Sequence, residues 1–342
     1  MLIDGTRSEG GGQILRTAAG LAARMSLPCR FTGIRAGREQ PGLREQHLQS
    51  MEALARYVNG ELSGARIGAM DVTFAPGQRR EESLAVSIRT AGSITLLIQP
   101  FLLAVRPGES LTLEISGGAT HTRMAPPVEY INHVLAPLLR AFGVDVSILA
   151  TDYGFYPPGG AIARCEIRAG EPQQALRLVE PGPVTAVRGV SLASEHLRRA
   201  RVAERQAESA AAELAQVVRC PIRIDTRTVP APSPGSAVVL WAEGPNRLLG
   251  ADALGQKGHP AEAVGREAAT RLWREIEAGA CVDAHAADMI APFIALSDLP
   301  CAALTSEATR HLTTNIDTAR LFLGPRIRLD GTVITSTNAD GR

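Results

Sequence analysis

The stretch MLIDGTRSEGGGQILRTAAGLAAR (residues 1–24) contains the first half of the unit from which the fold is predicted to be built. A short strand over Leu2 to Asp4 leads into a glycine-rich loop over Gly5 to Gly12, and a helix follows over Gln13 to Arg24. Glycines ahead of a helix allow backbone N–H groups to approach an anion. They also make an ordinary tight turn, and the pattern alone does not decide between the two.

The same order of elements recurs along the chain. After the first strand, loop and helix, the pattern predicts a strand over 30–35, a helix from Pro41 to near residue 60, and closing strands within 66–74. A second copy begins at residue 84 and includes a predicted helix over 127–142, and a third, partial copy covers 286–337. Repeats of this size indicate modules in which helices pack on a sheet.

Prolines mark a change of composition between the second and third copies. Pro181 and Pro183 come before it, and Pro230, Pro232 and Pro234 lie within a stretch that has its own strands and two long helices. The sequence therefore predicts an inserted domain over residues 181–277. The body would consist of residues 1–180 and 278–342.

Composition excludes several classes of protein. The 36 basic and 35 acidic residues give a net charge of +1, so no overall field attracts nucleic acid over many phosphates, and such a partner would be held locally. Five scattered cysteines without CxxC spacing argue against a zinc site or a disulfide framework and favour a cytoplasmic protein. The longest apolar run, near 94–105, is interrupted by Gln99 and Pro100, so no membrane association is expected.

The segment RHLTTN (residues 310–315) carries the candidate nucleophile. His311 lies just ahead of a short amphipathic run, and a neutral imidazole offers a lone pair near pH 7. A helix N-terminus beside it would favour an attached phosphate. Histidine can act as a covalent nucleophile toward phosphorus. Lysine is the more usual nucleophile in nucleotidyl transfer, and this chain has a single lysine, Lys257.

Candidate anion-binding residues follow the glycine-rich loop and the second strand. Glu9 could ligate a divalent cation or cap a helix, and Arg16 could point back toward the loop or form a surface ion pair. Arg35 and Arg38 lie where a strand ends, so their guanidinium groups could converge on phosphate oxygens. His47 continues the spacing of an apolar helix face, which fits a core histidine as well as a ligand contact.

Later segments offer candidates of the same kind. Gln99 interrupts an apolar helix, where a buried amide needs a partner from the backbone or from a ligand base. Pro127 could lie against a purine or simply shape a turn. His285 and Asp288 are three residues apart at a helix start, where an acid commonly only compensates the helix dipole.

Together these segments closely resemble the RNA 3′-terminal phosphate cyclase family. The matching pieces are EGGGQILR (9–16), IRAGR with PGL and QH (34–47), TAGS (90–93) with Gln99, SGG through APP (116–127), GFYPPGG (154–160), LGQKGHPAE (254–262), HAAD (285–288) and HLTTN (311–315). The resemblance implies an α+β fold of three repeated modules, each a four-stranded sheet with two helices, similar to the C-terminal domain of a translation initiation factor. A smaller inserted α/β domain completes it.

The resemblance also implies a reaction. His311 would take AMP from ATP, pass it to an RNA 3′-phosphate, and the neighbouring 2′-oxygen would close a 2′,3′-cyclic phosphodiester. RNA 3′-phosphate ends would be the partner, DNA would not be the main substrate, and a homodimer stays open. The residues implied to bind the nucleotide are Arg16, Arg35, Arg38, Gln46, His47, Gln99, Pro127, His285, Ala286, Ala287, Asp288 and Met289. Glu9 would ligate a divalent metal, Mg²⁺ or Mn²⁺.

Two other classes of protein have a related fold, and the sequence distinguishes this chain from each of them. Cyclase-like factors of RNA processing and ribosome assembly share the fold without adenylation, and they lack the nucleophilic histidine that this chain has at His311. Enolpyruvyl transferases use related repeats but depend on active-site lysines. A chain with Lys257 as its one lysine fits that class poorly.

Overall fold

The computed structural model describes residues 1–6, 11–78 and 80–337. The first repeat consists of β1 (Leu2–Asp4), α1 (Gly12–Met25), β2 (Cys29–Thr32), α2 (Glu45–Tyr57), β3 (Glu61–Ser63) and β4 (Val72–Ala75). Its sheet has the order β1-β2-β4-β3, in which β1 and β2 are parallel and the other neighbours are antiparallel.

The second repeat has the same topology. It consists of β5 (Ser83–Ser93), α3 (Ile94–Ala104), β6 (Ser110–Ala119), a second helical segment, β7 (Val144–Asp152) and β8 (Ile162–Ala169). The helical segment is divided into α4 (Val128–Tyr130), the π-helical turn η1 (Ile131–Leu135), α5 (Ala136–Leu139) and the 3₁₀ turn η2 (Arg140–Phe142). The sheet order β5-β6-β8-β7 reproduces that of the first repeat, with β5 parallel to β6.

The third repeat is interrupted in sequence but complete in space. Its first strand, β9 (Arg177–Leu178), pairs in parallel with a strand that follows more than 120 residues later. The remaining elements are α8 (Ala284–Leu296), β14 (Ala302–Leu304), α9 (Arg310–Leu323), β15 (Ile327–Asp330) and β16 (Val333–Ser336). The order β9-β14-β16-β15 is again the same. The α+β class with repeated four-stranded modules is therefore confirmed.

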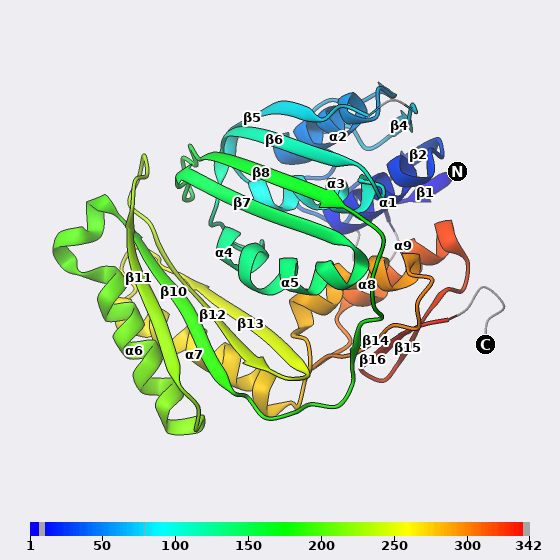
Figure 1. Cartoon of the computed structure of the whole chain (residues 1–342). Helices are drawn as coiled ribbons and strands as arrows, with labels where there is room; N and C mark the ends of the chain where they lie inside the picture. The colour runs from blue at the N-terminus through cyan, green and yellow to red at the C-terminus, as the bar shows by residue number, and fades with distance from the viewer. Residues whose placement is uncertain (7–10, 79, 338–342) are drawn as a thin grey trace.

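A fourth sheet lies between β9 and α8 in the sequence. Its elements are β10 (Ala186–Ser194), η3 (Glu195–Ala200), α6 (Val202–Val217), β11 (Ile222–Val229), β12 (Ser236–Gly244), β13 (Arg247–Leu254) and α7 (Ala261–Glu277). Alternate residues of a strand face opposite sides. Val238 and Leu240 accordingly join an apolar cluster with α6 and α7, whereas Val239 and Trp241 join the main core. Both long helices thus cover one face of the sheet, and the other face meets the body (Figure 1).

Helices of the three repeats meet in the interior. Helix α1 packs against α3 and α9, and α8 packs against α9, so the elements that begin with candidate site residues are neighbours (Figure 1). Where α1 crosses α3, a Cβ atom on Gly20 would lie 2.6 Å from the carbonyl oxygen of Pro100. Glycine is therefore required for this close helix packing.

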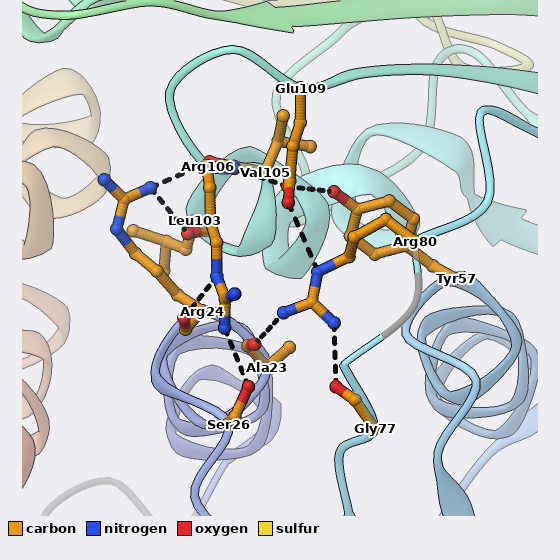
Figure 2. Close-up of polar contacts among 10 residues, drawn as sticks. All are labelled: Ala23, Arg24, Ser26, Tyr57, Gly77, Arg80, Leu103, Val105, Arg106 and Glu109. Carbon is orange, nitrogen blue, oxygen red and sulfur yellow. Dashed lines mark hydrogen bonds and ion pairs between the residues drawn. The ribbon is translucent and has the colours of Figure 1, made fainter.

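A polar cluster joins the first two repeats (Figure 2). The Arg106 guanidinium donates to the carbonyl oxygen of Arg24 at 2.8 Å, and Arg24 donates to a carbonyl at the end of α3 at 2.7 Å. Glu109 accepts from the Tyr57 hydroxyl at 2.9 Å and lies 3.7 Å from Arg80. Burial, followed by the charge of Arg106, lowers the pKa of the Arg80 guanidinium. The arginines thus compensate the partial negative charge at two helix C-termini, and Glu109 offsets their repulsion.

Several predicted boundaries need correction. Helix α2 begins at Glu45 and not at Pro41, because Gly42 has φ +77° and a Cβ there would lie 2.2 Å from the Gly68 carbonyl oxygen. The predicted helix over 127–142 is present as one continuous helical segment, although it changes from α-helical to π-helical, back to α-helical and then to 3₁₀. Strands β3, β8, β9 and β13 were not predicted. In the part of the chain that the structure describes, no helix is long and apolar enough to span a bilayer, which agrees with the sequence.

Candidate functional site

One cleft of about 960 Å³ collects most of the predicted site residues. It is lined from α1, α2, α3, α8 and α9, from the loop after β2, and by β13 and α7 on the opposite side. Binding pockets for small ligands commonly measure about 300–1,000 Å³. The predicted residues that line it are Arg16, Arg35, Arg38, Gln46, His47, Gln99, His285, Asp288, Met289 and His311.

Helix α1 opens onto this cleft. Its N-cap Gly11 provides no side-chain hydrogen bond, its first turn contains no acidic residue, and Gly12 and Gln13 line the cleft. The first N–H groups of a helix have no partners within the helix and carry a partial positive charge. The local structure therefore suits an anion beside the start of α1.

Arg16 extends from the second turn of α1 and is held on two sides. Its Nε donates to Gln99 Oε1 at 2.7 Å, and its Nη2 donates to Gln13 Oε1 at 2.6 Å. The Gln99 amide nitrogen lies 3.5 Å from the Met289 sulfur. These bonds fix the guanidinium at the junction of α1, α3 and α8.

His47 is a neutral hydrogen-bond donor facing the cleft. Its pKa is lowered to about 3, mainly by burial and in addition by the charges of Arg16, Arg35 and Arg44. Its Nδ1 lies 3.2 Å from the backbone nitrogen of Arg44, which donates to it. A neutral imidazole has one donor nitrogen and one acceptor nitrogen, so the proton is on Nε2, next to Gly12. Nδ1 therefore caps α2, while the buried ring also lines the cleft.

Arg35 lies in a strained turn at the cleft. Its φ is +54°, a left-handed conformation that is uncommon outside glycine, and its Nη1 donates to two backbone carbonyls of residues 40 and 42. Burial, then the charges of Arg44 and Arg38, lower the pKa of its guanidinium. Arginines gathered in this way repel one another, and a bound polyanion would relieve the repulsion.

The nucleophile candidate lies at the start of α9. Thr309 is the N-cap and accepts from the backbone nitrogen of Leu312 at 2.8 Å, which places His311 in the first turn. The Thr309 hydroxyl donates to Asp288 of α8 through a short hydrogen bond. Burial raises the pKa of the Asp288 carboxyl to about 7, although the Thr309 hydrogen bond opposes the rise. Helices α8 and α9 are thereby joined at the point where His311 enters the cleft.

The opposite wall was not foreseen from the sequence. Asp252 lies in β13 and Gln256 follows that strand. The other wall residues are Glu267 and Arg271 from α7 and Arg123 from the loop after β6. Arg271 is engaged by Glu267 at 2.5 Å, whereas Arg123 donates to the neutral Gln256 amide at 2.6 Å. Two quoted sequence segments reach this wall: LGQKGHPAE contains Gln256, and the segment from SGG through APP contains Arg123.

Four predicted residues are placed elsewhere or not described. Ala286 and Ala287 are fully buried in the core and do not line the cleft. Pro127 is buried as the N-cap of α4, and Pro126 takes the place beside the cleft. Glu9 lies outside the described residues. Across the described ranges, no group of three or more His, Cys, Asp or Glu side chains is arranged to hold a metal ion.

The fold and the cleft define an α+β protein of repeated modules with an arginine-rich cleft where the repeats meet. A family model described as RNA 3′-terminal phosphate cyclase matches residues 7–329. The chain is 40% identical to the RNA 3′-terminal phosphate cyclase of Pyrococcus furiosus over 334 residues, which covers 97% of this chain and 96% of the relative. It is 40% identical to that of Hyperthermus butylicus (94% and 91% covered) and 38% identical to that of Methanopyrus kandleri (96% and 95% covered).

The chain belongs to the RNA 3′-terminal phosphate cyclase family. The resemblance noted from the sequence is confirmed, and with it the assignment to a family of enzymes. The particular roles of the site residues remain predictions.

Proposed function

We propose that this protein converts an RNA 3′-terminal phosphate into a 2′,3′-cyclic phosphodiester at the expense of ATP, through a covalent His311–AMP intermediate. Family membership supports the overall reaction, since the matched relatives are named for it. The observation that carries the proposed mechanism is that His311 lines the same cleft as three arginines from the first repeat. Covalent nucleotidyl transfer needs a nucleophile and a triphosphate cradle in one place.

The nucleotide is proposed to lie between α1 and α8. Arg16, Arg35, Arg38, Gln46 and His47 would hold the triphosphate, since all five side chains line the cleft and offer N–H donors. His47 contributes an Nε2–H donor and no charge. The adenosine would contact Gln99, His285, Asp288 and Met289, and His285 is exposed at the cleft. Pro127, Ala286 and Ala287 are buried, so they would shape that pocket without contacting the adenosine.

The proposed reaction has three steps. A ring nitrogen of His311 attacks the α-phosphorus, the bond to the bridging oxygen of the β-phosphate breaks, and pyrophosphate leaves as the ring loses its proton. An oxygen of the RNA 3′-phosphate then attacks the same phosphorus, and the P–N bond breaks to return the histidine. Finally the 2′-oxygen attacks the 3′-phosphorus, loses its proton, and expels AMP. The last step is intramolecular, which gives it a large effective molarity, and it requires a ribose 2′-OH and hence RNA.

The RNA end is proposed to lie along the opposite wall of the cleft. The first wall would be occupied by the nucleotide, and Arg123 on the second is exposed and, among the described residues, forms no ion pair. Met124 beside it is 84% exposed at φ +61°, which presents an apolar side chain to the opening. Phosphate contacts by arginine and apolar contact with a base are ordinary means of holding a single strand.

A divalent metal is proposed to arrive with the triphosphate. Mg²⁺ is commonly held by one or two carboxylates together with substrate phosphates, so the lack of a three-residue cluster in the described chain does not conflict with this arrangement. Glu9 is the expected protein ligand. The metal would neutralise phosphate charge.

Two coarser proposals concern organisation and location. Residues 181–277 are proposed to be an inserted domain, supported by their own sheet and the separate apolar cluster with α6 and α7. A cytoplasmic location is supported by the five cysteines, all of which are free thiols.

The experiment that tests the proposed function follows the RNA product. A 3′-phosphorylated oligoribonucleotide incubated with ATP and Mg²⁺ or Mn²⁺ should become resistant to phosphatase, and His311→Ala should abolish the conversion. The matching oligodeoxyribonucleotide, which has no 2′-OH, should give no cyclic product. Full conversion by the alanine variant would exclude His311 as the nucleophile.

A further inference from the structure

Asn315 has no role in the site described above, yet it is completely buried one turn after His311. Its Oδ1 accepts from Gln13 Nε2 at 3.1 Å and from the Thr17 hydroxyl at 2.6 Å, and its Nδ2 donates to the Asp288 carbonyl oxygen at 2.6 Å. A single amide from α9 therefore bonds to α1 twice and to α8 once. Each of these elements also contributes a residue to the cleft.

The bonds of Asn315 continue to the arginine of the nucleotide site. Gln13 uses its amide nitrogen for Asn315 and its oxygen for Arg16, at 2.6 Å. Arg16 in turn donates to Gln99 on α3 at 2.7 Å. Asn315, Gln13, Arg16 and Gln99 form one continuous chain of side-chain hydrogen bonds that links three repeats through their helices.

Helix α9 is consequently fixed at two points. The N-cap Thr309 bonds to the Asp288 carboxyl, and Asn315 bonds to the Asp288 carbonyl. Residues four apart lie on the same face of a helix, so the orientation of Asn315 also sets the orientation of His311. Loss of the Asn315 bonds would leave buried polar groups of α1 and α8 without partners, and α9 could rotate or shift to satisfy them.

We propose that Asn315 is a positioning residue that holds His311 and Arg16 in register for attack on the α-phosphorus. The inference rests on the proposed function. It adds that the geometry of the nucleophile depends on an amide without contact to the nucleotide. A displacement of about 1 Å can reduce a rate about a hundredfold. The effect should therefore fall on the rate at saturating ATP and only weakly on the ATP concentration required.

The test compares Asn315→Leu with Asn132→Ala. Asn132 is a half-buried amide in η1 that bonds twice to the backbone of Ile148, at 2.8 and 2.9 Å, and it does not line the cleft. Single-turnover labelling of the protein with α-labelled ATP is measured over a range of ATP concentrations, beside thermal unfolding. Asn315→Leu should slow labelling at saturating ATP about tenfold to a hundredfold with little change in half-saturation. Asn132→Ala should lower thermal stability without changing either value.

Two further variants keep the test decisive if Asn315→Leu does not fold. Thr17→Val removes one donor to Asn315 while preserving shape, and Gln13→Glu keeps the acceptor for Arg16 but removes the donor to Asn315. Both should slow labelling at saturating ATP. Wild-type rates in the folded variants would overturn the inference alone, and so would a defect confined to half-saturation. No label on the wild-type protein would overturn the proposed function and the inference with it.

Discussion

Replacing Asp288 with asparagine should stabilise the protein more at alkaline pH than in mild acid. The Asp288 side chain is buried and bonds to Thr309, and its surroundings contain His285, Asp283 and Glu307. Burial is the largest cause of its raised pKa. Asp283 and Glu307 add to the rise, whereas the Thr309 hydroxyl and His285 oppose it.

The magnitude follows from the two pKa values of this carboxyl. Its ordinary value is 3.8, and in the folded chain it is about 7, so between these values the folded state binds the proton more strongly than the unfolded state. The protonated Asp288 carboxyl therefore stabilises the folded state at low pH, and this stabilisation is lost as the pH rises from about 4 to about 7. With about 1.4 kcal/mol for each pKa unit, the wild-type protein should lose about 2 to 3 kcal/mol through Asp288 between about pH 5 and pH 8.

Urea unfolding of wild-type and Asp288→Asn proteins across this range measures the difference directly. Asparagine remains neutral in the folded and unfolded states and can still accept from Thr309, so position 288 adds no pH dependence to the variant. The stability of the variant relative to wild type should therefore be greater near pH 8 than near pH 5 by the amount given above. Asp317→Asn, at an exposed position of α9, serves as the control. A wild-type and a variant protein with parallel pH profiles would refute the reasoning.

Three further predictions concern separate parts of the molecule. Arg38→Ala should raise the KM for ATP about tenfold or more with intact circular dichroism, because a phosphate contact is lost, and unchanged kinetics would remove Arg38 from the site. Glu109→Gln should lower the free energy of unfolding by about 2 kcal/mol, since Arg80 loses its carboxylate partner and its repulsion with Arg106 is no longer offset, and an unaltered melting temperature would contradict this. Arg123→Ala should raise the KM for 3′-phosphorylated RNA about tenfold without altering labelling by ATP alone. Slower labelling would instead place Arg123 beside the nucleotide.

The repeated fold could be predicted because most of its helix starts and strands are marked by local sequence patterns. The strands that were not predicted lack a local sequence pattern. Strand β13 contains Gly250, Ala251 and Ala253, which have weak strand preference and are held by pairing with β12. Strand β9 is two residues long and exists only because β14 lies beside it. Pairing between distant segments determines both strands, and no local pattern contains that information.

The cleft residues at helix starts and strand ends could be predicted in the same way, and the structure brings most of them together. The hydrogen bonds among these residues could not be predicted from the sequence. Gln13 and Asn315 are about 300 residues apart in sequence, and their contact depends on how α1 and α9 cross. The exclusion of Ala286 and Ala287 from the cleft has the same origin, since the rotation of α8 decides which side chains face inward.

The central claim is that His311 becomes covalently joined to AMP. Wild-type protein incubated with ATP and a divalent metal, then digested and analysed by mass spectrometry under alkaline conditions, should show a single peptide that carries AMP. Fragmentation should place the modification on His311, and the adduct should be labile to acid, as a phosphoramidate is. AMP on Lys257, on another histidine or on no residue at all would contradict the mechanism proposed for this cleft.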